Sequence, residues 1–155
     1  MKCLIHLACY FQPDKAGRPL NLIEINEARK VFNNLIDYSK VRVFHHKFFA
    51  LQGHRIIMAP DGNIYWPGET GNLCSCSAST YIHEMMHVYQ YQQGVNVITR
   101  GLLLHTLRGL SFNHYNPYQL NYQPDKPWQH YNIEQQAEIA RLIYLGQLPN
   151  IILSP

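Results

Sequence analysis

The chain has 155 residues, about the length of one domain. Apolar residues make up 46% and charged residues 15%, a balance typical of globular and not of disordered proteins. A domain of this size buries roughly two-thirds of its unfolded surface, so a metal site in it is expected to serve function rather than folding. The net charge of +3 is small, and lysine and arginine form no run, which argues against nucleic-acid binding.

The N-terminal segment is apolar but short. His6 interrupts it and Gln12-Pro13-Asp14 follows, so we predict a first strand at residues 3–11 and no export signal of the protein's own. No apolar run approaches the roughly eighteen residues that a membrane-spanning helix needs. The four cysteines, at positions 3, 9, 74 and 76, lack the usual zinc-binding spacing. Free thiols or one disulfide fit them, and they do not indicate the compartment.

Residues 21–66 predict one helix followed by a small mixed sheet. Asn21 and Glu24 form the Asn-x-x-Glu capping box of a helix over 21–36. Apolar residues at helical spacing predict the face of this helix that packs in the core: Ile25, Ala28, Val31, Phe32, Leu35 and Ile36. Three β-rich runs predict the strands, at 41–44, 55–59 and 63–66.

The second half of the chain predicts three helices and one long loop. Helices are expected at 78–93 and 97–110. Residues 111–130 contain several X-Pro steps and five aromatic residues, which indicates an ordered loop. Asn132 then caps a last helix over 133–145. We therefore expect a single α+β domain over residues 1–155.

The segment His83-Glu84-Met85-Met86-His87 is an HExxH motif within the helix at 78–93. Residues at i and i+4 lie on one helix face, about 6 Å apart along the axis, so both imidazoles can reach one ion. Glu84 lies one step round the helix, where it can contact a water on that ion. The motif predicts one catalytic Zn²⁺ per chain, with His83 and His87 as ligands and Glu84 as the general base.

A catalytic zinc site needs a third protein ligand and one open position. Candidates downstream are His105, His114, His130, Glu134 and Glu138. The metzincin class requires a histidine six residues after His87. Gln93 occupies that position, so the metzincin class is excluded. Glu134, in the first turn of the last helix, is our first choice. Glu138 is then expected to accept a hydrogen bond from a ligand imidazole, although the reverse assignment stays open.

Residues 111–131 are rich in groups that can donate a hydrogen bond to a developing oxyanion. The donors in this segment are His114, Tyr115, Tyr118, Tyr122, His130 and Tyr131. We keep His114, Tyr115 and Tyr131 as oxyanion candidates. A peptide substrate is expected to pair in extended form with the edge strand at 63–66.

Longer segments resemble a known family. The segments at 83–90, 94–97 and 131–138, with 27–32, 37–43 and 62–68 upstream, are similar to zincin metallopeptidase domains at the C-terminal end of VgrG spike proteins. Those domains are bacterial type VI secretion effectors, and the similarity covers roughly residues 20–146. It implies a minimal thermolysin-like zincin, in which a small mixed sheet packs on the HExxH helix and a C-terminal helix bears a ligand. It also implies His83, His87 and Glu134 as ligands and Glu84 as base.

The same resemblance implies a peptide-bond hydrolase toxic to rival bacteria. Such a protein is made in the bacterial cytoplasm and is delivered to the target periplasm or secreted, with a spike protein and an immunity protein as partners. We expect this chain, unlike those domains, to act without a spike domain of its own. Two alternatives remain: a zinc-dependent hydrolase or amidase of peptidoglycan, and a zinc-stabilised binding module without turnover. Glu84 argues against the binding module, because a structural site has no use for that carboxylate.

Overall fold

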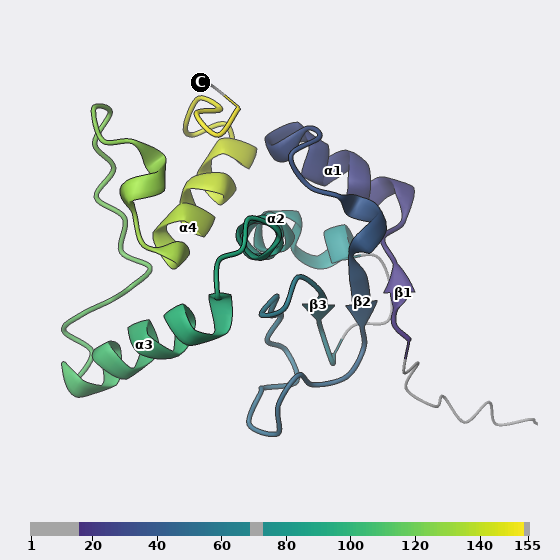
Figure 1. Cartoon of the computed structure of the whole chain (residues 1–155), viewed down its shortest axis with the longest axis horizontal. Helices are drawn as coiled ribbons and strands as arrows, with labels where there is room; N and C mark the ends of the chain where they lie inside the picture. Colours follow the sequence, from purple (N-terminus) through teal and green to yellow (C-terminus); the bar gives the residue numbers. More distant parts are fainter. Residues whose placement is uncertain (1–15, 69–72, 154–155) are drawn as a thin grey trace, which may run out of the picture.

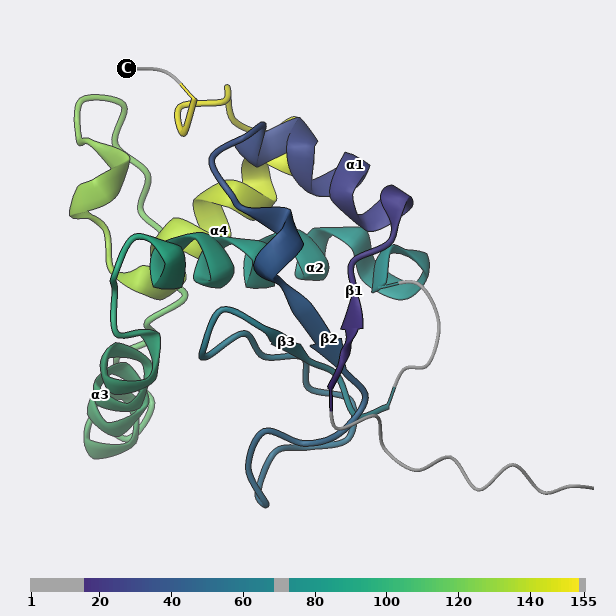
Figure 2. The same ribbon diagram turned by 45° about the vertical axis from the view of Figure 1, so that its right-hand side comes forward.

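The computed structural model describes residues 16–68 and 73–153 and has an α+β architecture around one central helix. In Figures 1 and 2, α2 (Leu73–Gln92) runs through the middle, with α1 (Leu22–Phe32) and α4 (Ile133–Tyr144) on one side of it. The strands and α3 (Val97–Leu110) lie on the other side. The strand predicted at residues 3–11 lies outside the described residues, as do the side chains of the four cysteines.

Helix α1 begins with the predicted capping box. The Asn21 side chain accepts a hydrogen bond from the Glu24 amide, and the Glu24 carboxylate accepts one from the Asn21 amide. That carboxylate, fully buried, also accepts from the Arg18 guanidinium and from the backbone amide of Leu73. Glu24 therefore ties together the segment before α1, α1 itself and the start of α2. The helix ends at Phe32, earlier than predicted, because Asn33 adopts a positive φ of 47°.

The sheet has three short strands, β1 (Arg18–Pro19), β2 (Arg42–Phe44) and β3 (Ile64–Tyr65). Strand β2 lies in the centre, antiparallel to β1 and parallel to β3. The prediction of a small mixed sheet is therefore confirmed. A short 3-10 helix, Tyr38–Lys40, leads from α1 into β2.

The strand predicted at 55–59 does not form. Met58 alone pairs with Tyr65, through two backbone hydrogen bonds of 2.8 and 3.1 Å. The buried side-chain amide of Gln52 donates to the carbonyls of Ile56 and Tyr65, at 2.7 and 3.1 Å. Because this side chain satisfies the Ile56 carbonyl, a strand ladder at that residue is replaced by a tight loop.

Helix α2 contains a break at Ser77, whose φ of −165° and ψ of 82° are not helical. The Ser77 hydroxyl accepts a hydrogen bond from the Thr80 amide and lies 2.6 Å from the Thr80 hydroxyl, so it caps the helix that follows. The regular helix thus begins after Ser77, as predicted. It ends at Gln92, and Gly94, whose φ is +80°, lets the chain leave the helical path. Between these ends, buried residues of the helix lie on several of its faces: Tyr81, Ile82, Met85, Met86 and Val88.

The last two predicted helices are confirmed, α3 at its predicted bounds and α4 within one residue of them. Between them runs the long loop, which contains only a short 3-10 helix, Trp128–His130. A second capping box, Asn132 with Gln135, opens α4, and α4 packs extensively on α2. No helix in the described part of the chain is long and apolar enough to cross a membrane.

Candidate metal centre

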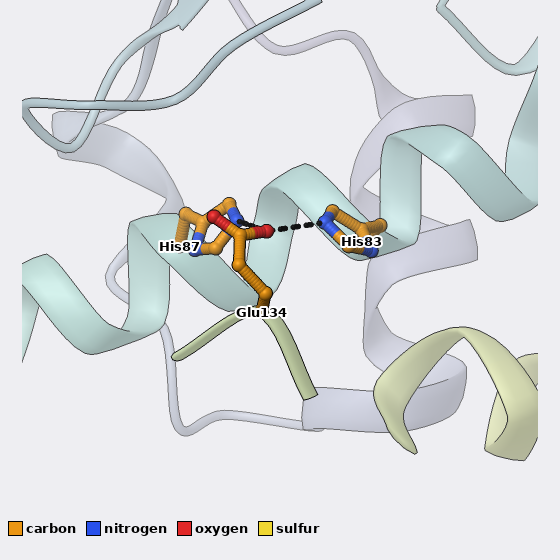
Figure 3. Close-up of side chains that lie close together, drawn as sticks. All are labelled: His83, His87 and Glu134. Atoms are coloured by element: carbon orange, nitrogen blue, oxygen red, sulfur yellow. Dashed lines mark hydrogen bonds and ion pairs between the residues drawn. The ribbon is translucent and has the colours of Figure 1, made fainter. Parts of the chain in front are cut away.

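Three side chains from two helices converge beside α2 (Figure 3). His83 and His87 lie one turn apart on α2, and Glu134 lies in the first turn of α4. The Nε2 atoms of both histidines lie 3.4 Å from the same Glu134 oxygen, Oε2. One ligand atom from each of the three residues lies within 4.8 Å of the others, so this group can bind a metal ion.

The two glutamates on α4 have different surroundings. The Asn132 capping box fixes the start of α4, and the packing of α4 on α2 brings Glu134 to the histidines. Glu138, one turn further along, instead accepts two hydrogen bonds from Arg141, at 2.8 and 2.6 Å. The structure therefore brings Glu134 and not Glu138 to the paired histidines.

Gln90 occupies the place that was predicted for Glu138. Its side-chain amide donates to the Ile133 carbonyl at 3.0 Å and to Gln136 Oε1 at 2.9 Å. These acceptors fix the orientation of the amide, so its oxygen faces His87 Nδ1 at 2.8 Å. An amide oxygen only accepts, which puts the Nδ1 proton on His87 and leaves Nε2 free to ligate. Glu138 is thus not the partner of His87 in this structure.

The signal for Gln90 was present but ambiguous in the sequence. Gln90 is three residues after His87, so it lies on the same side of the helix as that ligand. Its neighbours Tyr89, Tyr91, Gln92 and Gln93 are polar or amphipathic as well, so the sequence alone does not distinguish Gln90 from a residue on a solvated face. Only the packing of α4 on α2 buries it.

Glu84 is buried next to this group. Burial raises the pKa of its carboxyl, against the opposing influence of the charges on His87 and His83 and of a hydrogen bond from the Ala59 amide. The negative charge of Glu134 raises that pKa as well. A carboxyl with a raised pKa, held beside a ligand group, is suited to exchange protons near neutral pH.

Charges within the group perturb its other members. Burial would raise the pKa of Glu134, but hydrogen bonds to His83 and His87 and their charges hold it well below its usual range. Burial would likewise lower the pKa of His87, but the hydrogen bond to Glu134, with the charges of Glu134 and Glu84, raises it to about 9. With Glu134 ionised, His87 therefore keeps its proton in the metal-free protein, and a bound metal ion would have to displace it.

A cavity of about 880 Å³ opens beside His83, Glu84, His87 and Glu134. The loop before β3, at 48–60, forms one wall, and α3 forms the other. Tyr118 also lines it, with its ring centroid 6.2 Å from that of His83 and its hydroxyl 3.3 Å from His105 Nε2. Burial, then the charges of Glu134 and Glu84, raises the pKa of Tyr118, so its hydroxyl stays protonated.

The three oxyanion candidates lie elsewhere. His114 Nδ1 lies 2.8 Å from the Ser111 carbonyl, and the Tyr131 hydroxyl accepts from the Gln123 amide. The Tyr115 hydroxyl is 3.5 Å from the Asn132 side-chain amide. None of the three lines the cavity, whereas Tyr118, from the same segment, does. Hydrogen bonds from Asn132 to the Pro117 carbonyl and from Gln135 to the Gln119 carbonyl fix this part of the loop to α4.

The expected substrate edge is also displaced. Both backbone groups of Tyr65 in β3 are bonded to Met58, so this edge is covered at its centre. Residues 57–60, which lie outside β3, line the cavity instead. Tyr65, at the centre of the edge predicted at 63–66, is therefore not free to pair with another strand, whereas residues 57–60 lie at the cavity.

Comparison with known proteins shows which family the chain resembles. No family model matches the chain. The chain is 39% identical over 140 residues to the type VI secretion system spike protein VgrG2b of Pseudomonas aeruginosa. This match covers 86% of the chain but spans only 13% of the spike protein's length. The solved effector domain of Pseudomonas aeruginosa VgrG2b matches with a TM-score of 0.76 and 36% identity, over 89% of this chain and 79% of that one.

Proposed function

This chain belongs to the family of the VgrG2b effector domain, and from that membership and the site we propose that it is a zinc-dependent metallopeptidase effector. The observation that carries the proposal is the His83, His87 and Glu134 group, with its ligand atoms within 4.8 Å and Glu84 buried beside it. Two imidazoles and one carboxylate are the donor set of catalytic zinc sites that keep an open position.

The residues fit a zinc ion in their positions and in the neutral tautomer that Gln90 favours for His87. His83 Nε2, His87 Nε2 and the Glu134 carboxylate would hold the ion, and Gln90 keeps the proton of His87 on the other nitrogen. Bound there, zinc would polarise the scissile carbonyl and lower the pKa of water. Glu84 would take a proton from the attacking water at its carboxylate and then deliver it to the nitrogen of the leaving amine.

We assign Tyr118 the part of an oxyanion donor. Its hydroxyl is protonated, it faces the cavity, and it lies within hydrogen-bonding distance of His105. A neutral donor placed beside the reacting carbonyl stabilises the negative charge that develops there. This residue replaces His114, Tyr115 and Tyr131, the candidates from sequence.

The cavity favours a polypeptide over a glycan as substrate. Its walls are mostly apolar, with Ile56, Ile57 and Met58 on one side and Val97, Ile98 and Leu102 on the other. Such walls accept apolar side chains, whereas a glycan strand would leave its hydroxyls without partners. Cleavage of peptidoglycan peptides, which are less apolar, is the second candidate. A toxic role in the periplasm of target cells, with an immunity protein and a spike protein as partners, completes the proposal.

The decisive experiment compares products of the intact chain and of Glu84→Gln. Both proteins, loaded with zinc, are incubated with a periplasmic extract and with purified sacculi, and the products are identified by mass spectrometry. We expect new protein termini in the extract and a fall of about 10²- to 10⁴-fold in the variant, because the general base is lost while the three ligands remain.

Elemental analysis supplies the control for that experiment. About one zinc per chain is expected in both proteins. If the intact chain binds zinc but cleaves neither protein nor sacculi, the binding-module alternative stands in place of the peptidase. If only sacculi are cleaved, the peptidoglycan alternative holds.

A further inference from the structure

Helix α3 carries apolar side chains that no other part of the described structure covers. Besides Ile98 near its start, its exposed members are Leu102, Leu103, Leu107 and Leu110, and Phe112 is exposed two positions beyond its end. Leu110 is 72% exposed and Phe112 is 86% exposed. Leucines at these positions add nothing to the folded core, so their presence calls for a partner outside the described chain.

The opposite wall of the cavity has the same character. Phe49, Leu51 and Ile56 are exposed on the loop before β3, Leu51 by 89%. This loop and α3 project to the same side of α2 in both views, away from α1 and α4 (Figures 1 and 2). Phe49, Leu51, Ile56 and Leu102 all line the cavity. We call these eight exposed residues the apolar rim: Phe49, Leu51, Ile56, Leu102, Leu103, Leu107, Leu110 and Phe112.

Charge on the same side of the molecule is of one sign. The sequence has no Asp or Glu between Asp37 and Asp61, and none between Glu84 and Asp125. These two segments supply both walls, and the basic residues in or next to the walls are Lys47, Arg55, Arg100 and Arg108. Lys40, earlier in the first segment, is paired with Asp37 instead. The acidic residues of the helices are on α1, α4 and at the metal centre. The apolar rim is thus bordered by cationic and not by acidic side chains.

We propose that the apolar rim docks on the surface of an anionic lipid bilayer, with the mouth of the cavity at the membrane. Apolar side chains bordered by lysine and arginine match the interface of such a bilayer, where the chains enter the acyl boundary and the cations meet the headgroups. Helix α3, with its 14 residues, is roughly 21 Å long. It is too short to cross a hydrocarbon core of about 30 Å, so it would lie in the plane of the membrane surface.

A second copy of the chain fits this face less well. A symmetric contact places the same patch against itself, so it would bring Arg100, Arg108 and Lys47 of one copy close to those of the other. Neither wall offers a carboxylate to neutralise them. An anionic surface satisfies the apolar and the cationic groups together, which is why we favour it.

Docking of this kind would place the mouth of the cavity where a polypeptide at the membrane surface could enter it. It defines the substrate class more narrowly as polypeptide at or near the bilayer. This consequence rests on the proposed function, but docking itself does not, because no member of the apolar rim is a proposed ligand or catalytic group.

The test is sedimentation of the full chain with lipid vesicles, in the Glu84→Gln form so that no cleavage occurs. Vesicles of phosphatidylglycerol and phosphatidylethanolamine are compared with vesicles of phosphatidylcholine alone. We expect binding to the anionic vesicles, weaker at high salt. Leu103→Asn, Leu110→Asn and Phe112→Asn combined should reduce the partition coefficient by about tenfold or more, because each removes an inserted apolar side chain.

Matched variants on the far side of the molecule control for exposed apolar surface and for charge. Leu22→Asn with Ile23→Asn, both on exposed positions of α1, should bind like the parent. Arg100→Gln should weaken binding about fivefold, as expected for one cation near an anionic surface, and Lys30→Gln on α1 should not. Circular dichroism checks that each variant is folded.

Equal partition of the parent and the triple variant, or no binding of the parent to anionic vesicles, would overturn the proposal. Light scattering that finds a dimer in the parent and a monomer in the triple variant, without vesicle binding, would assign the face to a second copy and overturn it equally. The peptidase proposal is separable. The triple variant with Glu84 restored should cleave a soluble peptide like the native chain, since none of its three positions lines the cavity.

Discussion

The two sides of α2 differ in how far their apolar side chains are buried. On the side of α1 and α4, most large apolar side chains are buried, with Leu22 and Ile23 at the start of α1 as exceptions, and both helices begin with capping boxes. On the side of α3 and the loop before β3, large apolar side chains are exposed around a cavity. The first side provides the stability that holds the ligands, and the second is free to contact substrate and surface. Stability and recognition are therefore separable by mutation.

The sharpest contrast is between two apolar residues of similar size. Met85 in α2 is fully buried, whereas Leu103 in α3 is exposed. Met85→Ala should lower the free energy of unfolding by about 2–5 kcal/mol, because it leaves a cavity in the core. Leu103→Ala should change it by no more than about 0.5 kcal/mol. Urea denaturation with a chelator present, so that metal binding does not contribute, measures both. Equal losses would show that α3 belongs to the folding core.

Glu24 gives the stable side a dependence on pH. Burial would raise its pKa, but hydrogen bonds from Arg18 and from the amides of Leu73 and Asn21 lower it below the ordinary 4.5. The stability from this carboxylate is therefore complete above that ordinary value and is lost as the pH falls through the lower folded value. Glu24→Gln should cost about 1.5–3 kcal/mol at pH 7, typical of hydrogen bonds to a charged group.

The difference between the native chain and Glu24→Gln should then shrink as the solution is acidified below pH 4.5. Denaturation curves at a series of pH values measure it. Glu138→Gln, on the half-exposed pair with Arg141, serves as the control and should show a small difference throughout. A gap for Glu24→Gln that stays constant down to pH 3 would contradict the role given to this carboxylate.

Gln90 joins the stable side to the proposed zinc site. Gln90→Leu keeps much of the volume but removes the acceptor for His87 Nδ1 and the donor to Ile133. Loss of such a partner weakens metal affinity by about 10- to 100-fold. Competition with a zinc chelator measures the change. Gln92→Leu, two residues on and bonded to Asp37 instead, is the control and should leave zinc affinity unchanged. Unaltered affinity in Gln90→Leu would mean that His87 is oriented by other contacts.

Features set by short stretches of sequence were predicted well. The capping box of α1 and the N-cap of α4 at Asn132 need only residues about three apart, and the spacing of His83 and His87 needs only one helical turn. The bounds of α3 follow from a helical pattern between Asn96, whose side chain caps it, and Ser111. In each case the determining contacts are local, so the pattern carries most of the information.

Features set by contacts between distant segments were not predicted from the sequence. The run at 55–59 reads as a strand, but the Gln52 amide bonds to the Ile56 and Tyr65 carbonyls and holds a loop there. Tyr118 was one of six similar donors in the sequence, and the loop that is anchored to α4 brings Tyr118 and not Tyr115 to the cavity. Gln90 became a partner of His87 through the docking of α4 on α2. Composition and spacing do not encode such contacts.

The smallest expected effect on zinc affinity is that of Glu138→Gln, and its contrast with Glu134→Gln tests which glutamate of α4 belongs to the proposed zinc site. Glu134 contacts both histidines, whereas Glu138 is held by Arg141 through an i,i+3 pair. Glu138→Gln should therefore change zinc affinity by less than about threefold, within the range of a half-exposed ion pair. Glu134→Gln removes one of three proposed protein ligands and should lower the affinity by more than the roughly 100-fold upper bound for an outer partner. Because Arg141 lines the cavity, Glu138→Gln can alter KM for a peptide while the metal stays bound. Chelator titration of both variants decides between them, and a Glu138→Gln protein that releases zinc more readily than Glu134→Gln would reverse the two assignments.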